Sequence, residues 1–301
     1  MKIIKQPSKN QWQQIIQRPV QDLSSLSQKV QAILDDVKLN GDSAVKKYTK
    51  QFDCVDITEM KVTRAEIDHA DTLLSDDIKK AIEIASSNIY AFHQKQITAS
   101  EIIETMPGIQ CWRKSVAIEK VGLYIPGGTA PLFSTILMLG IPAKIAGCKQ
   151  IVLCSPPGKN GEMHPAILYA ANKVGIADIY KTGGVQAIAA MAYGTETIPQ
   201  LYKIFGPGNQ YVTSAKQLIQ QQGIAIDMPA GPSEVCVLAD DAANPAYVAA
   251  DLLAQAEHGA DSQVMLVASS SFNIDDCLKQ LKKQLELLPR KEIASKALEN
   301  S

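Results

Sequence analysis

The sequence predicts an α/β protein built from parallel β-sheets. From about residue 117 onward, short apolar runs typical of strands alternate with stretches of helical periodicity. Gly-rich turns separate several of these strands from the helices that follow, and a Pro/Gly-rich loop divides the alternation into two stretches. Strict strand–helix alternation is the signature of βαβ units. We therefore expect two Rossmann-like units, the second inserted in the first, together with an N-terminal helical segment.

The first hundred residues are predicted to be mainly helical. Residues 20–48 and 76–94 carry apolar side chains at helical spacing. Within the first of these stretches, Asn40-Gly41-Asp42 predicts that the helix breaks and restarts. We expect these helices to belong to the unit that follows the Pro/Gly-rich loop.

The alternating region allows each element to be placed. In the first stretch the expected strands are 121–125, 150–154, 176–180 and 203–205, and the expected helices are 132–146, 165–174, 185–193 and 210–220. After the loop at 225–233, strands at 235–238 and 263–267 alternate with helices at 244–257, 275–288 and 291–299. These boundaries predict three parts, which are a helical arm at 1–22, a first Rossmann-like domain at 23–123 and 234–301, and a second at 124–233.

Composition and charge exclude several classes of protein. The 301 residues are 46% hydrophobic and 20% charged, which is ordinary for a globular protein with a sizeable core. A net charge of -1 gives no electrostatic reason to expect a nucleic acid or an anionic membrane as partner. The N-terminus lacks the apolar core of a signal peptide, and the longest apolar stretch, 131–143, is too short to span a membrane. The six scattered cysteines form no C-x-x-C pair, so we expect them to be reduced and the protein to be cytoplasmic.

Three Gly-rich turns each follow an expected strand and precede an expected helix. They are Pro126-Gly127-Gly128, Gly183-Gly184 and Gly206-Pro207-Gly208-Asn209. Helix N-termini favour phosphate groups, and ligands of open α/β sheets bind beyond the carboxyl ends of the strands. The usual dinucleotide fingerprint, G-x-G-x-x-G, is absent. Two interpretations stay open at this point, an anionic ligand or glycines that only permit tight turns.

Gln255 and His258 form the other candidate site. They lie three residues apart on an expected helix, so their side chains share one face. Histidine is the commonest metal ligand, and a glutamine carbonyl is an acceptable oxygen ligand. The spacing alone favours a simpler role, a histidine whose charge suits the dipole of a helix C-terminus. Two ligands are also fewer than the four that zinc normally takes.

A third group of residues lies at strand ends. Tyr124, Gln186 and Asn209 each follow an expected strand closely, which places them near one rim of the first α/β stretch. Cys154 also ends an expected strand, where a nucleophile can sit, although a small buried apolar side chain is the commoner role. Position alone assigns none of these residues a function.

Five segments resemble the histidinol dehydrogenase family, in the same order along the chain. They are VGLYIPGGTAPLFSTILML at 121–139, GGVQAIAAMAYG at 183–194, FGPGN at 205–209, DMPAGPSE at 227–234 and LLAQAEHG at 252–259. The resemblance extends through nearly all of the chain and is weakest near the N-terminus. It implies two successive hydride transfers to NAD, which oxidise L-histidinol to L-histidine through a bound L-histidinaldehyde in the last step of histidine biosynthesis.

The resemblance also implies roles for particular residues. It implies that Tyr124, Gln186 and Asn209 contact NAD, which makes 124–233 the NAD-contacting domain. It implies that Ser233, Gln255 and His258 contact L-histidinol, and that Gln255 and His258 also bind zinc, one ion per active site. In the family, the zinc is understood to anchor the imidazole and amino groups of the substrate, and the complete protein is expected to be a homodimer.

The sequence departs from the family's pattern after residue 301. The family's pattern continues into a Gly-Pro-Glu-His motif, whose Glu and His are the acid–base pair, and then into further zinc-binding and substrate-binding residues. No histidine follows His258 in this chain, so the pair has no counterpart and no catalytic residue is predicted. We therefore expect a truncated chain, either a fragment or a naturally shortened relative, that turns over histidinol poorly or not at all.

Two other functions stay open on the sequence. One is a non-catalytic nucleotide-binding remnant of the same family, which keeps the NAD pocket without the chemistry. The other is an enzyme of the aldehyde-dehydrogenase kind that works through Cys148 or Cys154.

Overall fold

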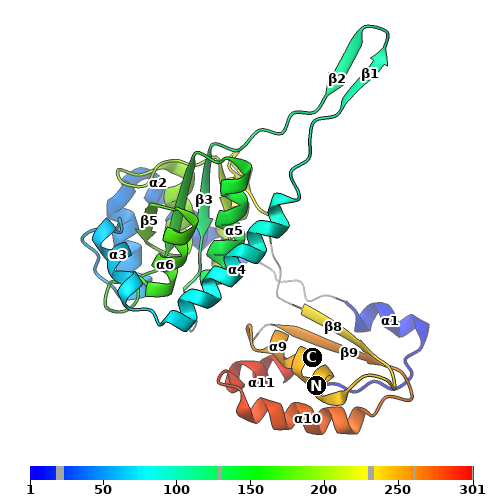
Figure 1. The fold of residues 1–301 in the computed structure, drawn as a ribbon. Helices are drawn as coiled ribbons and strands as arrows, with labels where there is room; N and C mark the ends of the chain where they lie inside the picture. Colours follow the sequence, from blue (N-terminus) through cyan, green and yellow to red (C-terminus); the bar gives the residue numbers. More distant parts are fainter. Residues whose placement is uncertain (18–23, 128–130, 230–233, 261, 300) are drawn as a thin grey trace. The chain divides into compact units, whose positions relative to one another are not determined.

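The computed structural model describes residues 1–17, 24–127, 131–229, 234–260, 262–299 and 301. Contacts between residues divide the chain into two compact units (Figure 1). The larger unit is Gln21–Pro229, and the smaller unit combines Met1–Val20 with Ala230–Ser301. The boundary after Pro229 lies within the Pro/Gly-rich loop that the sequence predicted as a division between two α/β units.

A five-stranded parallel sheet forms the centre of the larger unit. Its strand order is β5-β4-β3-β6-β7, and every neighbouring pair is parallel. The strands are β3 (Lys120–Tyr124), β4 (Gln150–Ser155), β5 (Asp178–Lys181), β6 (Lys203–Phe205) and β7 (Ala225–Ile226). Because β3 lies in the middle and the chain order changes direction there, its carboxyl end adjoins a crevice of the kind in which α/β proteins bind ligands. The predicted α/β class with a parallel sheet is confirmed.

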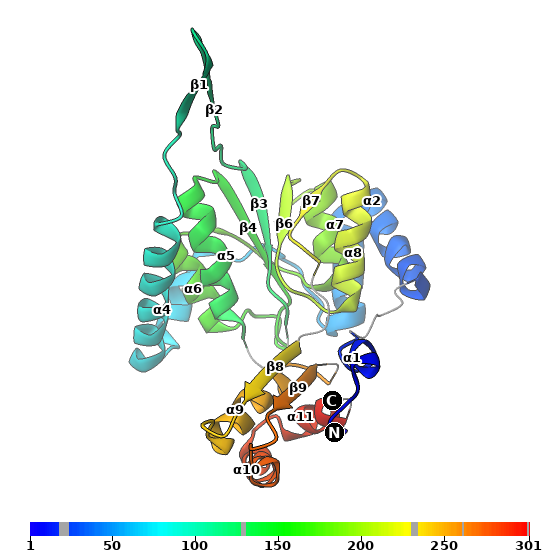
Figure 2. The ribbon, with the colours of Figure 1, turned by 90° about the vertical axis from the view of Figure 1, so that its right-hand side faces the viewer.

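Helices cover both faces of this sheet (Figure 2). One face carries α2 (Ser24–Asp53), α7 (Gly184–Tyr193) and α8 (Gln210–Gln221), whose apolar side chains share a core with Tyr124, Val152 and Ile204. The other face carries α3 (Arg64–Thr72), α4 (Asp76–Gln94), α5 (Phe133–Ala146) and α6 (Pro165–Val174), which pack around Val121, Leu123 and Leu153. The predicted interruption of the first long helix is present, since Gly41 has φ 52° and ψ -132° inside α2.

The contacts group the N-terminal helices differently from the predicted domain boundaries. We expected 23–123 to belong with 234–301, but the structure places 21–123 in one compact unit with 124–229. The physical reason is burial. Val30, Leu34 and Val37 of α2 are fully buried in the core on one face of the five-stranded sheet. Helical periodicity shows that a helix has an apolar face, but it does not show which sheet covers that face.

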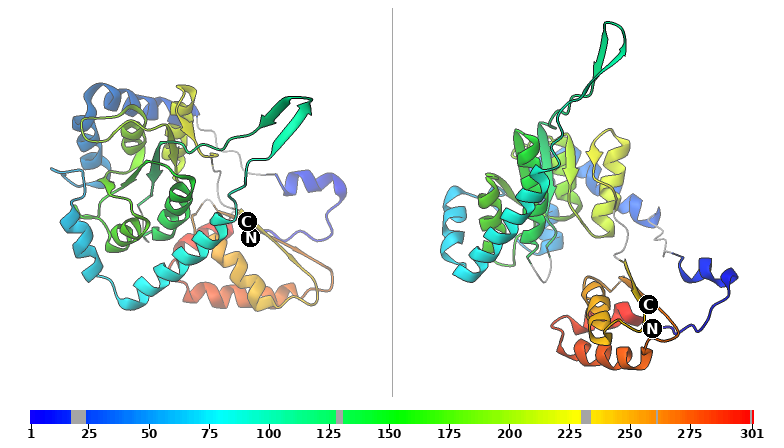
Figure 3. Two further views of the ribbon diagram at one scale, coloured as in Figure 1. Left: turned by 45° about the horizontal axis from the view of Figure 1, so that its top comes forward. Right: turned by 45° about the vertical axis from the view of Figure 1, so that its right-hand side comes forward.

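A β-hairpin in the larger unit was not predicted. Strand β1 (Ile102–Met106) pairs antiparallel with β2 (Ile109–Trp112), and both strands are exposed along their whole length. Figure 3 shows this hairpin extending away from the sheet and helices of its unit. Its apolar residues do not alternate with polar ones, so the period-two pattern that identifies a half-buried strand is missing.

The smaller unit is a second, shorter α/β arrangement. Two parallel strands, β8 (Glu234–Ala239) and β9 (Gln263–Ala268), flank α9 (Pro245–Ala256) in sequence and are followed by α10 (Ile274–Leu287) and α11 (Lys291–Glu299). Its core contains Val248, Leu252 and Ala297. The short helix α1 (Lys9–Ile15) lies in the N-terminal segment that contacts this unit. In neither unit is a described helix both long and apolar enough to cross a membrane.

Candidate functional site

A cavity of about 1390 Å³ lies at the carboxyl edge of the five-stranded sheet. Its wall includes Tyr124 at the end of β3, Ser155 at the end of β4, Gly184 at the start of α7 and Asn209 before α8. Tyr124 and Asn209 are expected from the sequence at one rim of the sheet, and the structure brings both to this cavity. The N-termini of α6, α7 and α8 therefore line one cavity, an arrangement that favours a phosphate-containing ligand.

Tyr124 is held with its hydroxyl at the N-terminus of α7. The side chain is 4% exposed, and its phenolic oxygen accepts a hydrogen bond from the backbone N–H of Gly184 at 3.2 Å. Burial raises the pKa of Tyr124 to about 12. The hydroxyl therefore keeps its proton at neutral pH and can donate it in a hydrogen bond to a ligand.

Asn209 and Gln186 occupy the first turns of the two helices. The side-chain oxygen of Asn209 accepts hydrogen bonds from the backbone N–H groups of Tyr211 and Val212, both at 3.1 Å, so Asn209 caps α8. Its NH₂ group has no hydrogen bond to the described residues and can donate to a ligand. Gln186 is 1% exposed, does not line the cavity, and has a buried Oε1 with no hydrogen-bond partner in the described part of the chain.

Asp53 is a cavity residue that the sequence analysis missed. It is the last residue of α2, and its Oδ2 is buried without a hydrogen-bond partner among the described residues. Burial raises the pKa of the Asp53 carboxyl group. One feature of the sequence could have identified Asp53. A carboxylate at the C-terminus of a helix is unfavourable next to the partial negative charge there, so its presence at that position indicates a role other than helix stability.

The Gly-rich turns have a packing role in this site. A Cβ atom on Gly127 or Gly183 would lie 2.4 or 2.6 Å from the ring of Pro156, so both turns close tightly on that proline. A Cβ atom on Gly206 would lie 2.0 Å from the carbonyl oxygen of Tyr124. The structure thus gives each turn a steric reason for glycine, while Gly127 and Gly184 also line the cavity.

A buried ion pair fixes the turn that leads to Asn209. Lys216 of α8 is 5% exposed, donates a hydrogen bond to the carbonyl oxygen of Gly206 at 2.9 Å and forms an ion pair with Asp227. The other carboxylate oxygen of Asp227 accepts a hydrogen bond from the N–H of Gly206 at 2.8 Å. Lys216 and Asp227 therefore hold both polar groups of Gly206, just before the N-cap of α8.

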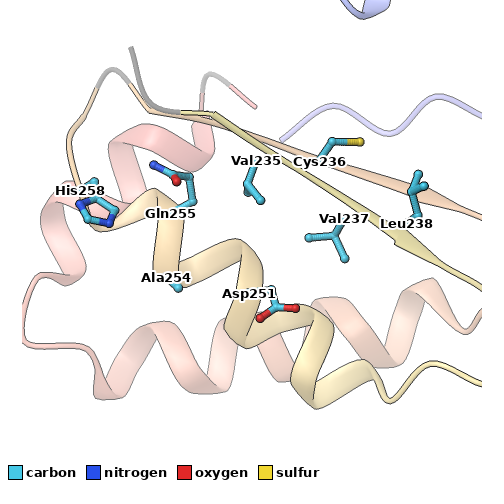
Figure 4. Close-up of a pocket in the computed structure, with 8 residues that line it drawn as sticks. All are labelled: Val235, Cys236, Val237, Leu238, Asp251, Ala254, Gln255 and His258. Atoms are coloured by element: carbon cyan, nitrogen blue, oxygen red, sulfur yellow. The ribbon is translucent and has the colours of Figure 1, made fainter. Parts of the chain in front are cut away.

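The second candidate site lies in the smaller unit. Gln255 and His258 line a pocket of about 510 Å³ at the C-terminal end of α9, beside β8 (Figure 4). Figure 4 shows the Gln255 amide on the side of α9 that faces β8 and His258 next to it, with Asp251 a turn earlier. The Nε2 of Gln255 is buried without a hydrogen-bond partner in the described segments, so this amide is available to a ligand.

These two side chains fit part of a zinc site and do not complete one. An imidazole and an amide are suitable donors, but zinc normally takes four ligands. Within the described ranges, no group of three or more His, Cys, Asp or Glu side chains could hold a metal ion. Ser233, the third predicted substrate contact, lies outside the described residues.

Neither Cys154 nor Cys148 has the environment of a nucleophile. Cys154 is fully buried in the sheet, and burial raises the pKa of its thiol. Burial also raises the pKa of the Cys148 thiol. A reactive cysteine needs a lowered pKa and access to its substrate, so the structure disfavours the interpretation as an enzyme of the aldehyde-dehydrogenase kind.

Comparison with known proteins relates these sites to a family. The family model described as histidinol dehydrogenase matches residues 16–301. This chain belongs to the histidinol dehydrogenase family. The histidinol dehydrogenase of Bacteroides thetaiotaomicron is 58% identical over 301 residues, covering all of this chain and 70% of that protein. The chloroplastic histidinol dehydrogenase of Arabidopsis thaliana is 50% identical over 297 residues, covering 98% of this chain and 63% of that protein.

A solved histidinol dehydrogenase has the same fold. The crystal structure from Elizabethkingia anophelis superposes with a TM-score of 0.94 at 55% identity, covering 97% of this chain and 67% of that chain. The resemblance seen in the sequence motifs is thereby confirmed. This chain spans about two thirds of the length of its histidinol dehydrogenase relatives.

Proposed function

We propose that the protein takes part in the NAD-dependent oxidation of L-histidinol to L-histidine through L-histidinaldehyde, and that NAD binds in the cavity of the larger unit. Its relatives are named as histidinol dehydrogenases, which are oxidoreductases of histidine biosynthesis. The observation that carries the cofactor proposal is the convergence of Tyr124, Asn209 and the N-termini of α7 and α8 on one cavity at the carboxyl edge of the sheet.

In this proposal Tyr124, Gln186 and Asn209 are the NAD contacts. Tyr124 supplies a protonated hydroxyl and Asn209 an NH₂ group that is unpaired among the described residues, both at helix N-termini that suit the pyrophosphate. Gln186 does not line the cavity among the described residues, so its proposed contact rests on the family resemblance and on its buried Oε1, which is unpaired in the described part of the chain. NAD offers ribose hydroxyls and amide N–H groups that could satisfy it.

L-Histidinol is proposed to bind through Ser233, Gln255 and His258, and zinc through Gln255 and His258. The unpaired Nε2 of Gln255 is a hydrogen-bond donor that suits an acceptor on the substrate, and the imidazole of His258 in the same pocket is a suitable zinc ligand. A zinc ion held there would anchor a substrate that itself supplies nitrogen donors, and the residues named here would orient that substrate. Two protein ligands give weak metal binding, so we propose that zinc affinity is low in the 301-residue chain.

Calorimetry with NAD tests the cofactor proposal directly. The 301-residue chain should bind NAD, and Tyr124→Phe and Asn209→Ala should each weaken that binding. If neither variant changes the NAD affinity, the cavity is not the cofactor site. Asn209→Ala also removes a helix cap, so Asn209→Asp, which keeps the cap oxygen and loses the NH₂ group, is the matched variant.

We propose that the 301-residue chain turns over histidinol slowly. It has no histidine after His258, and general acid–base catalysis typically contributes ~10²–10⁴-fold for each group. A steady-state assay of NADH formation at high histidinol concentration measures this, and activity typical of the complete relatives would refute it. NAD binding without turnover, in a gene that ends at residue 301, would instead favour a nucleotide-binding remnant of the family.

We propose that the complete protein is a homodimer, and the exposed surface of the larger unit supports an interface that this chain already contains. The hairpin exposes Ile102, Ile103, Met106, Ile109 and Trp112, and the nearby α4 region exposes Ile84, Tyr90, Phe92 and Ile97. A two-stranded hairpin is marginal in water by itself, and exposed apolar side chains gathered on it favour burial in an interface. Its charged neighbours Glu101, Glu104, Arg113 and Lys114 are balanced in sign, which permits pairing with a second copy of itself.

Sedimentation velocity tests this assembly. The chain should sediment as a dimer, and Ile103→Lys with Trp112→Lys should yield monomer without loss of secondary structure. If the variant with both lysines still sediments as a dimer, the hairpin is not part of the interface.

The proposed location is the cytoplasm. The six cysteines are free in the structure, which suits a reducing compartment, although the Arabidopsis relative is named as chloroplastic.

A further inference from the structure

The unpaired carboxylate of Asp53 is the feature of the cavity that no predicted contact uses. Asp53 lies one helical turn after Thr49, whose hydroxyl is 3.4 Å from the hydroxyl of Thr182, just before α7. The end of α2 therefore adjoins the start of α7, where Gly184 holds the hydroxyl of Tyr124. The negative charge of Asp53 also acts on Tyr124, since it contributes to the raised pKa of that phenol.

The unpaired oxygen of Asp53 is a hydrogen-bond acceptor, so a ligand that satisfies it must donate a hydrogen bond. Oδ2 of Asp53 is buried and has no hydrogen-bond partner in the described residues, and the neighbouring Lys50 is paired with Asp56 instead. Leaving a buried carboxylate oxygen unpaired is costly. Phosphate groups would be repelled at this position. The neutral donors of a dinucleotide are its ribose hydroxyls and its amine and amide N–H groups.

The cavity that Asp53 lines also has a surface that suits the adenosine half of a dinucleotide. Ile33, Tyr48, Phe52 and Leu73 line the same cavity, and the rings of Tyr48 and Phe52 stack at 5.8 Å between centroids. Apolar and aromatic side chains of this kind accept the flat face of a base. A carboxylate beside an adenine site is placed to accept hydrogen bonds from the hydroxyls of the attached ribose, as in other NAD-binding proteins.

We propose that the Asp53 carboxylate accepts hydrogen bonds from the adenosine ribose of NAD and thereby discriminates against NADP. The unphosphorylated 2′-hydroxyl gives Oδ2 the donor that it lacks in the free protein. The 2′-phosphate of NADP removes that donor and places negative charge beside the carboxylate. This inference rests on the proposed NAD site and adds a residue that sets its cofactor specificity.

The experiment compares NAD and NADP binding by calorimetry in the wild-type chain, Asp53→Asn and Asp56→Asn. Asp56→Asn is the matched control, because it makes the same chemical change three residues away in a carboxylate that lies outside the cavity. The wild type should prefer NAD. Asp53→Asn should weaken NAD binding by about tenfold to a hundredfold, the worth of a hydrogen bond to a charged group, and narrow the preference over NADP. The control should match the wild type for both nucleotides.

A second readout separates binding from folding. Asp53 has no partner to lose in the described structure, so Asp53→Asn should melt at the same temperature as the wild type or higher without nucleotide, while the increase in melting temperature with NAD becomes smaller. If the wild type binds NAD but Asp53→Asn leaves the NAD-to-NADP ratio unchanged, this inference fails and the cofactor site stands. If the wild type binds no NAD, the cofactor proposal fails and this inference with it.

Discussion

Removing the charge of Asp227 should destabilise the larger unit more than removing the charge of its partner Lys216. In Asp227→Asn, the Lys216 ammonium group would remain in an environment where its side chain is 6% exposed, with the carbonyl of Gly206 as its remaining described partner. In Lys216→Met, the carboxylate that remains is 28% exposed and keeps its hydrogen bond from Gly206 N–H. Water can solvate the second charge but not the first.

The magnitudes follow from this asymmetry. Leaving a buried charge unpaired costs about 3–5 kcal/mol, and the partial exposure of Asp227 places Asp227→Asn near about 3 kcal/mol. Lys216→Met loses hydrogen bonds without stranding a buried charge, so we expect about 1–2 kcal/mol. The double variant should cost less than the sum of the two, because no ammonium group remains to be stranded.

Urea unfolding followed by circular dichroism measures these free energies, with calorimetry as a second probe. For a unit of this size, 1 kcal/mol shifts the melting temperature by about 2–4 °C. The exposed pair Lys50–Asp56 is the control, because its side chains are 65% and 76% exposed and Asp56→Asn should cost less than about 1 kcal/mol. A larger cost for Lys216→Met than for Asp227→Asn, or strictly additive costs, would refute the reasoning.

Three further outcomes are expected. Gly206→Ala should destabilise the larger unit by more than about 3 kcal/mol in urea unfolding, because Gly206 has φ 134° and its Cβ would overlap the carbonyl oxygen of Tyr124; a loss below about 1 kcal/mol would contradict this. The pKa of Asp53 is raised, so the folded state binds that proton more tightly than the unfolded state, and stability should fall as pH rises above about 4. Asp53→Asn should abolish that part of the pH dependence. If the free energy of unfolding varies with pH identically in the wild type and in Asp53→Asn, this prediction is wrong. Cys154 should resist thiol reagents in the folded chain, and Cys154→Ala with Cys148→Ser should leave NAD affinity unchanged in calorimetry.

The sequence predicted the βαβ elements of the larger unit closely. The helices expected at 76–94 and 165–174 have those bounds in the structure, and the strand expected at 203–205 is β6. These elements combine an apolar period with punctuation by Gly or Pro, so local chemistry determines them. The strand expected at 176–180 begins two residues later, at Asp178, because Gly175 ends α6 in the left-handed conformation before the chain extends.

Tertiary packing could not be predicted in the same way. Which sheet α2 packs against depends on contacts between residues that are distant in sequence. The hairpin β1–β2 has no buried face, so its sequence lacks the alternation of apolar and polar residues that would predict its strands. The same limit applies to the site. Tyr124 and Asn209 were found because strand ends converge in any parallel sheet, whereas Asp53 reaches the cavity only because α2 packs against α7.

The two candidate sites differ in how much of their chemistry this chain supplies. The described residues that line the proposed NAD cavity belong to the larger unit, and the Lys216–Asp227 pair that fixes its Gly206 turn also lies in that unit. Gln255 and His258 lie in the smaller unit and provide two donors where zinc needs four. The proposed cofactor site therefore has its described contacts within one unit, whereas the proposed anchoring of the substrate needs donors that the described residues do not provide. This difference is the physical reason to expect NAD affinity in the 301-residue chain to be independent of zinc.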